Sequence, residues 1–201
     1  MSRPASPPPS DRRQELAEQA TDHVLAHGLI GLSLRPLARA IGTSDRMLLY
    51  HFADKGDLVA TVLRLANDRS VDGLAALPRS SGPSAAVHDL WAALSSSPLL
   101  GYVRVYVEAS ALGLLGEEPY AGVVAESNRS WYAALAAHLR ESGVPDHLAD
   151  RATGLVDACV LGLLLDLPLG ERDAGHRERR TAVVADLAAT VAALSEAPSG
   201  D

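Results

Sequence analysis

The sequence has 201 residues, of which 47% are hydrophobic and 21% charged, so it can form a substantial hydrophobic core. Its single cysteine excludes an intramolecular disulfide framework and agrees with a reducing compartment, the cytoplasm. The longest apolar run, residues 158–165, is too short to span a bilayer, so no membrane partner is expected.

The net charge of −7 is distributed unevenly along the chain. Residues 1–56 carry seven basic and six acidic side chains, whereas residues 57–201 carry eleven basic and nineteen acidic ones. This asymmetry predicts two regions with different roles. The first ten residues, MSRPASPPPS, contain no apolar segment of the kind found in secretion signals, and their composition predicts a disordered tail over residues 1–10.

The remaining sequence has the pattern of an all-α protein of about nine helices. Alanine and leucine are abundant, and no segment alternates apolar and polar residues as a strand would. A first helix is predicted over residues 11–27, and Gly28 is expected to end it. Further helices are predicted over about 33–41, 44–51, 54–77, 84–95, 99–115, 118–142, 146–167 and 176–195.

Two short predicted helices in the N-terminal part have the spacing of a helix-turn-helix. Ser33 and Ser44 stand at their N-cap positions, and Gly42 provides the turn between them. Leu48 and Phe52 lie one helical turn apart and are expected to pack against the first helix of the pair. The opposite face of the second helix is then available for base edges and phosphates.

Residues 32–59 read LSLRPLARAIGTSDRMLLYHFADKGDLV. An R-x-L-A step at Arg35 is followed by the turn glycine, by the triplet YHF at residues 50–52, and by a lysine with a leucine three positions later. In combination these features resemble the DNA-binding domain of the TetR family of transcriptional regulators. The resemblance implies a helix-turn-helix DNA-binding domain over residues 11–56 and a ligand-binding and dimerisation domain over residues 57–197.

The resemblance further implies a repressor that binds a palindromic double-stranded DNA operator as a homodimer and is released by a small-molecule effector. Two positions depart from the family pattern, because Leu34 and Leu49 stand where hydroxyl or aromatic residues are frequent. These departures remove some expected phosphate contacts without changing the expected fold. The residues predicted to lie at the DNA are Ser33, Arg35, Ser44, Asp45, Arg46, Met47, Tyr50, His51 and Lys55.

Six of the eight aromatic residues fall between positions 91 and 132. Aromatic side chains gathered with a few polar groups are typical of a small-molecule pocket, although at helical spacing they also form ordinary core. Asp157 interrupts an apolar segment and needs a partner if it is buried. The residues predicted to bind the ligand are Trp91, Tyr102, Tyr106, Trp131 and Asp157.

Two C-terminal helices carry apolar residues at three- and four-residue steps, a spacing that allows a four-helix interface between two chains. The alternative is that the same residues form the internal core of a monomer. The residues predicted at the dimer interface are Leu155, Cys159, Leu163, Val184, Leu187 and Val191.

Two other functional classes remain open on the sequence. A constitutive DNA-binding dimer would use its larger domain for association only. An all-helical enzyme would need a nucleophile–base pair or a metal set, and the sequence contains no H-E-x-x-H, phosphate-loop or G-x-S-x-G motif. His23 and His27 are four positions apart but lack a third ligand, so no metal and no cofactor are expected.

Overall fold

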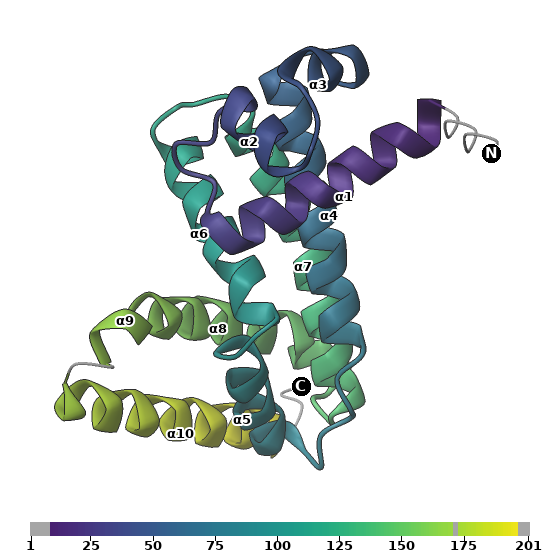
Figure 1. The fold of residues 1–201 in the computed structure, drawn as a ribbon. Helices are drawn as coiled ribbons and strands as arrows, with labels where there is room; N and C mark the ends of the chain where they lie inside the picture. Colours follow the sequence, from purple (N-terminus) through teal and green to yellow (C-terminus); the bar gives the residue numbers. More distant parts are fainter. Residues whose placement is uncertain (1–8, 171–172, 197–201) are drawn as a thin grey trace, which may run out of the picture. The chain divides into compact units, whose positions relative to one another are not determined.

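The computed structural model describes residues 9–170 and 173–196, and all regular structure in these ranges is helical (Figure 1). The predicted all-α class is therefore confirmed. The helices are α1 (Pro9–His27), α2 (Leu34–Ala40), α3 (Asp45–His51), α4 (Lys55–Ala75), α5 (Pro83–Leu94), α6 (Leu99–Leu114), α7 (Tyr120–Glu141), α8 (Asp146–Leu165), α9 (Leu167–Gly170) and α10 (Ala174–Glu196).

The helices divide into two compact units. Unit 1 comprises the chain up to Ser70 together with Gly101–Asn128, and unit 2 comprises Val71–Leu100 together with the chain from Arg129 onward. The predicted domain boundary at residues 56–57 does not coincide with this division, because most of α4 and most of α6 group with the helix-turn-helix.

The core of unit 1 contains buried residues of α1, α2, α3, α4, α6 and α7. Within it, α1, α2 and α3 contact one another (Figure 1). Leu16 and Val24 of α1, Leu37 of α2, and Leu48 at the centre of α3 are fully buried, as is Phe52 directly after α3. The 3.6-residue period of the helices aligns these side chains on inward faces, so the polar positions between them are turned to solvent.

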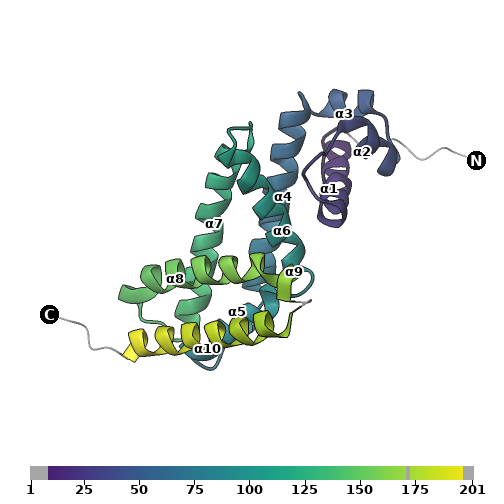
Figure 2. The ribbon, with the colours of Figure 1, turned by 90° about the vertical axis from the view of Figure 1, so that its left-hand side faces the viewer.

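The core of unit 2 is built largely by α5 and α10, with α8 lying alongside α10 (Figure 2). Its buried members recur at three- and four-residue intervals and include Leu90 on α5, Val156 on α8, and Leu187 and Val191 on α10. Burial of these aliphatic side chains is the main source of stability for this unit.

Three details differ from the sequence-based expectations. The helix α1 begins at Pro9, two residues inside the predicted tail, and the rest of that tail lies outside the described residues. The predicted helix 146–167 ends at Leu165, and a separate short helix α9 follows it. The predicted helix 176–195 is slightly longer and forms α10.

Candidate DNA interface and ligand site

The turn between α2 and α3 is fixed by backbone conformation and capping. Gly42 has φ +73°, a left-handed conformation that favours glycine, and the Thr43 N–H donates to the Ala38 carbonyl oxygen at 2.8 Å. The Ser44 hydroxyl accepts the Met47 N–H at 3.2 Å and so caps α3. Ser33 occupies the N-cap of α2, but its side chain makes no capping hydrogen bond.

The two faces of α3 differ sharply in exposure. Leu48 is fully buried and anchors the helix in the core of unit 1, whereas Tyr50 is 74% exposed. Met47 and Leu49 are also exposed, and the Tyr50 and His51 rings meet edge to face with their centroids 5.0 Å apart. The helix therefore presents aromatic, apolar and polar side chains on an outer face that is backed by a rigid core.

Exposed basic side chains stand on α3 and on the two helices that flank it in the sequence. Arg39 at the end of α2, Arg46 on α3 and Lys55 at the start of α4 are exposed. The Arg35 guanidinium, 84% exposed, has its Nε atom 3.9 Å from a carboxylate oxygen of Asp45. The other Asp45 oxygen accepts the Arg46 N–H at 3.0 Å. Such a loose, solvated ion pair contributes little to stability and leaves the guanidinium able to bind a phosphate.

The end of α3 is held by a cluster that sequence reasoning did not identify. An Arg13 guanidinium nitrogen lies 3.2 Å from the Asp57 carboxylate, and the guanidinium sits over the Phe52 ring at 4.4 Å. The same carboxylate accepts the Ala53 N–H at 3.0 Å. The Asp57 N–H donates to the Asp54 carboxylate at 2.8 Å, which caps α4. The separation of 44 positions between Arg13 and Asp57 explains why periodicity could not pair them.

Of the residues predicted to bind a ligand, the structure brings one pair into contact. The Trp131 indole N–H on α7 donates to a carboxylate oxygen of Asp157 on α8 at 2.8 Å, and both residues are half-buried. The expectation that Asp157 needs a partner is thus met within unit 2. An aromatic ring beside a carboxylate is a pairing that suits an organic cation.

The remaining predicted ligand residues lie elsewhere in the two units. Trp91 on α5 belongs to unit 2, where the Arg180 guanidinium carbon is 5.8 Å from the centroid of its ring, within cation–π range. Tyr102 and Tyr106 lie on α6 in unit 1 and are half-buried.

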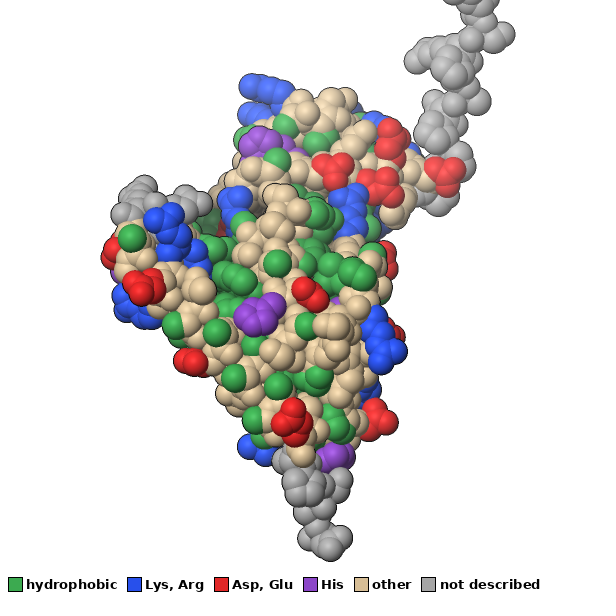
Figure 3. All heavy atoms as spheres, turned by 90° about the horizontal axis from the view of Figure 1, so that it is seen from below, with side chains coloured by type: hydrophobic (Ala, Val, Ile, Leu, Met, Phe, Trp, Pro, Cys, Tyr) green, Lys and Arg blue, Asp and Glu red, His purple; other side chains and the backbone are tan. Residues whose placement is uncertain are grey.

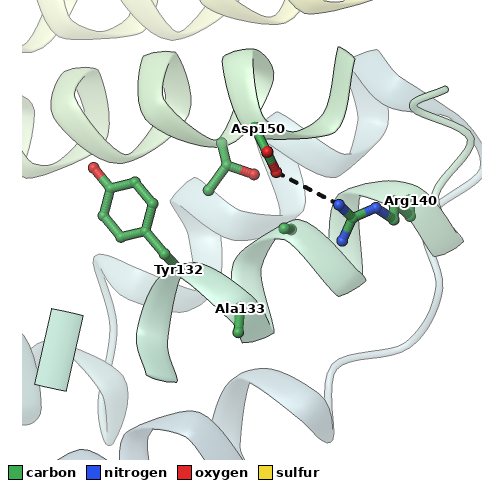
Figure 4. Close-up of a pocket in the computed structure, with 6 residues that line it drawn as sticks. Tyr132, Ala133, Arg140 and Asp150 are labelled. Atoms are coloured by element: carbon green, nitrogen blue, oxygen red, sulfur yellow. Dashed lines mark ion pairs between the residues drawn. The ribbon is translucent and has the colours of Figure 1, made fainter. Parts of the chain in front are cut away.

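A recess between α7 and α8 has a volume of about 270 Å³ (Figure 4). Figure 4 shows Tyr132 at one end and, at the other, the ion pair between Arg140 and Asp150, whose closest atoms are 3.5 Å apart. Tyr132 is the sequence neighbour of Trp131, but none of the five predicted ligand residues lines this recess. Its lining residues are Tyr132, Ala133, Ala136, Arg140, Asp150 and Thr153.

The predicted dimer residues separate into two groups. On α8, Leu155 is exposed, and Cys159 and Leu163 are half-buried. Burial raises the pKa of the Cys159 thiol, which favours its protonated form. The second group lies on α10, and its side chains fill the core of unit 2. They expose almost no surface to a partner chain, so their assignment to a dimer interface is corrected. This group consists of Val184, Leu187 and Val191.

No group of three or more histidine, cysteine, aspartate or glutamate side chains in the described ranges is arranged to hold a metal ion. Within those ranges, no helix has both the length and the apolar character needed to cross a bilayer. Figure 3 shows one face of the molecule, on which side chains of both charges and apolar side chains are exposed.

The chain matches no protein-family model. It is 30% identical over 170 residues to the HTH-type transcriptional regulator BetI of Agrobacterium fabrum (strain C58 / ATCC 33970), a match that covers 79% of this chain and 80% of that protein. Its fold is similar to that of a transcriptional regulator from Rhodococcus sp. Rha1, with a TM-score of 0.70, 20% identity, and coverage of 93% of this chain and 99% of the other.

Two further solved structures share the fold. A TetR-family transcriptional regulator from Rhodococcus sp. has a TM-score of 0.69 at 17% identity, covering 91% of this chain and 99% of the other. A transcriptional regulator from Saccharomonospora viridis, solved in complex with choline, has a TM-score of 0.62 at 22% identity, covering 87% of this chain and 94% of the other.

Proposed function

Since the chain belongs to the TetR family of transcriptional regulators, we propose that it is a ligand-responsive repressor that binds a palindromic operator as a homodimer. The observation that carries this proposal is the contrast within α3, whose buried Leu48 fixes the helix while Tyr50 projects into solvent. A helix anchored on one face and furnished with polar and aromatic groups on the other is suited to the major groove.

In this proposal the residues around α3 divide into two roles. Arg46, Met47 and Tyr50 meet base edges and the sugar–phosphate backbone from α3 itself. Arg35 and Lys55, at the starts of the flanking helices, bind phosphates. Phosphate contacts of this kind supply sequence-independent affinity, and they make the affinity fall as salt rises.

The DNA-binding role is tested by selection from a randomised duplex library at two salt concentrations. Recovery of a two-fold symmetric motif is expected. Tyr50→Ala should lose affinity for the motif. Lys55→Ala should weaken binding to all duplexes, and it should reduce the slope of log affinity against log salt concentration by about one. Ala137→Ser, on an exposed position of α7, is a control that should bind as the wild type does. Binding without a motif would contradict the proposal.

Dimerisation is proposed through exposed small and apolar side chains on α8 and α10. Leu155 and Leu165 are 38% and 55% exposed, and they lie on α8 with exposed Ala158 and Gly162 between them at helical spacing. Small residues permit close approach of helix backbones, so paired α8 and α10 helices from two chains can pack as a four-helix bundle. The α10 positions that would join this surface are Ala182, Ala185, Ala189 and Ala193.

The effector is proposed to be a small organic cation that binds at Trp131 and Asp157. The indole N–H engages one oxygen of the Asp157 carboxylate, and the ring and the negative charge together provide the two elements that recognise an ammonium group. The choline bound by the Saccharomonospora viridis regulator supports this class of ligand. Effector binding would lower operator affinity by favouring a second conformation of the dimer.

Titration calorimetry with choline tests the effector class. Wild-type protein should bind choline, and Asp157→Asn, which keeps an oxygen for the indole N–H but removes the charge, should weaken binding at least about tenfold. Asp150→Asn is the matched control, because its carboxylate pairs with Arg140 in the neighbouring recess. Equal binding by the wild type and Asp157→Asn would contradict the assignment.

A further inference from the structure

A single carboxylate on α6 holds the segment that connects α1 to α2. The Glu108 Oε2 atom accepts the Leu29 N–H at 2.6 Å and the Ile30 N–H at 2.7 Å. The two donors are consecutive and lie 79 and 78 residues away from Glu108 in the sequence. Short hydrogen bonds to an ionised acceptor are among the strongest that a protein makes.

The connecting segment has little rigidity of its own. Gly28 and Gly31 have φ +92° and +80°, so two residues with the widest conformational freedom stand in the six residues 28–33. Leu29 is buried in the core and Leu32 packs against it in part, while Ile30 between them is 64% exposed. The conformation of the segment therefore depends on tertiary contacts, and among them the Glu108 carboxylate binds its backbone N–H groups directly.

The fit around the carboxylate is close. A Cβ atom placed on Gly28 would lie 3.1 Å from the second carboxylate oxygen of Glu108, tighter than ordinary van der Waals contact. Glycine at position 28 thus serves both the left-handed turn and the approach of the carboxylate. Because α2 begins at Leu34, directly after this segment, the placement of α2, and with it α3, relative to α1 depends on how the segment is held.

We propose that Glu108 is a positioning residue for DNA binding, which fixes the α1–α2 segment and thereby pre-organises the helix-turn-helix for the operator. This inference rests on the proposed DNA-binding function. A looser segment lets α2 and α3 sample more orientations, and ordering them again on the DNA lowers the affinity. Glu108 itself does not touch the DNA, so the number of phosphate contacts stays the same.

The test compares Glu108→Ala and Glu108→Gln in the full-length protein. Backbone hydrogen exchange should accelerate at Leu29 and Ile30 by at least about tenfold in Glu108→Ala, because both amides lose their acceptor. Affinity for the selected duplex should fall about tenfold, with the slope of affinity against salt unchanged. Glu108→Gln retains an oxygen acceptor without the charge and should lie between the wild type and Glu108→Ala in both measurements.

Three control variants separate positioning from general loss of stability. Asp22→Asn and Glu126→Asn remove carboxylates that pair with Arg69 at 2.6 Å and with Arg64 at 2.9 Å, also in unit 1. Both should keep wild-type exchange at Leu29 and wild-type affinity. Val62→Ala trims the fully buried core of the unit, so it should lower the melting temperature while leaving the affinity for DNA below that temperature unchanged.

Each remaining outcome overturns the inference. Wild-type exchange at Leu29 and Ile30 in Glu108→Ala would show that the carboxylate does not hold these amides. Faster exchange with unchanged affinity would make the contact structural only. If the wild-type protein selects no duplex motif, the proposed function itself fails, and the role of Glu108 in DNA binding fails with it even where exchange confirms the contact.

Discussion

The Trp131 indole nitrogen and the Asp157 carboxylate are joined by a 2.8 Å hydrogen bond between α7 and α8. Replacing Asp157 with alanine leaves the half-buried indole N–H without its acceptor, and the free energy of unfolding should fall by about 1 kcal/mol. Asp157→Asn, which preserves an acceptor, should lose less. Urea denaturation measures both, with Asp150→Asn as a surface control that should stay near the wild type. Equal losses for the two Asp157 variants would contradict a role for the hydrogen bond.

Leu48 and Tyr50 lie two positions apart on α3 and should respond in opposite ways to truncation. Leu48 is fully buried, so Leu48→Ala should destabilise the protein by about 2–4 kcal/mol through lost burial and a cavity. Tyr50 is 74% exposed, and Tyr50→Ala should change stability by less than about 0.5 kcal/mol while weakening DNA binding. Chemical denaturation and duplex titration distinguish the two effects. A large stability loss in Tyr50→Ala would argue against its role as a reader of DNA.

Gly28 and Gly31 form a matched pair for the contact with Glu108. Both have positive φ, so alanine at either position should be strained by about 1–2 kcal/mol. A Cβ at Gly31 has no atom within 4 Å, whereas a Cβ at Gly28 meets the Glu108 carboxylate. Gly28→Ala should therefore unfold at lower denaturant concentration than Gly31→Ala. When Glu108→Ala is added to each glycine variant, the two should unfold at the same denaturant concentration. A remaining difference between them would mean that a contact other than Glu108 causes it.

Sequence periodicity predicted the parts of the fold that depend on local chemistry. Gly28 and Gly42 end helices in left-handed conformations, and Ser44 caps α3 as its position indicated. Leu48 is buried because its neighbours at three- and four-residue steps define the inner face of α3. These features need only a few adjacent residues to specify them.

The features that sequence reasoning missed depend on residues far apart in the chain. Glu108 accepts amides almost eighty positions away, and no period or motif links a glutamate on α6 to a loop after α1. The assignment of Val184 and Leu187 to a dimer interface failed for a related reason. Apolar spacing shows that a helix has a buried face, but it does not show whether that face meets the same chain or another.

His138 predicts a pH dependence of stability. Burial lowers the pKa of its imidazole below the ordinary value of 6.5, an effect that the carboxylates of Glu141 and Asp89 partly oppose. The unfolded chain therefore binds more protons than the folded one near pH 6. The contribution of neutral His138 to the free energy of unfolding is fully present above pH 6.5, and it is lost as the pH falls through the lower pKa of the folded state.

Replacing this histidine should flatten the acid side of the stability profile. His138→Gln should lose less unfolding free energy between pH 7 and pH 5, at about the ends of the histidine titration range, than the wild type does. Thermal denaturation across this range measures the slope, and the absolute stability of the variant does not matter to the comparison. His147→Gln, at an exposed position on α8, should retain the wild-type slope. An unchanged slope in His138→Gln would assign the pH dependence to other groups.

The proposed dimer surface on α8 and α10 can be tested by introducing charges on it. Leu155→Glu and Ala189→Glu place charges on exposed positions of the two helices, where a partner chain would bury them without a counter-charge. Each variant should elute as a monomer in size-exclusion chromatography with light scattering, and it should keep the helical circular dichroism of the wild type. Ala92→Glu, at an exposed position on α5 of the same unit, should remain dimeric.

The same variants connect the oligomeric state to DNA binding. A palindromic operator requires two recognition helices about one DNA turn, or ~34 Å, apart, and a monomer supplies only one. Leu155→Glu should therefore bind a single half-site and the full palindrome with nearly equal, weak affinity, whereas the wild type should prefer the palindrome. If Leu155→Glu stays dimeric, the partner contacts another surface, and the small side chains on α10 are exposed for a different reason.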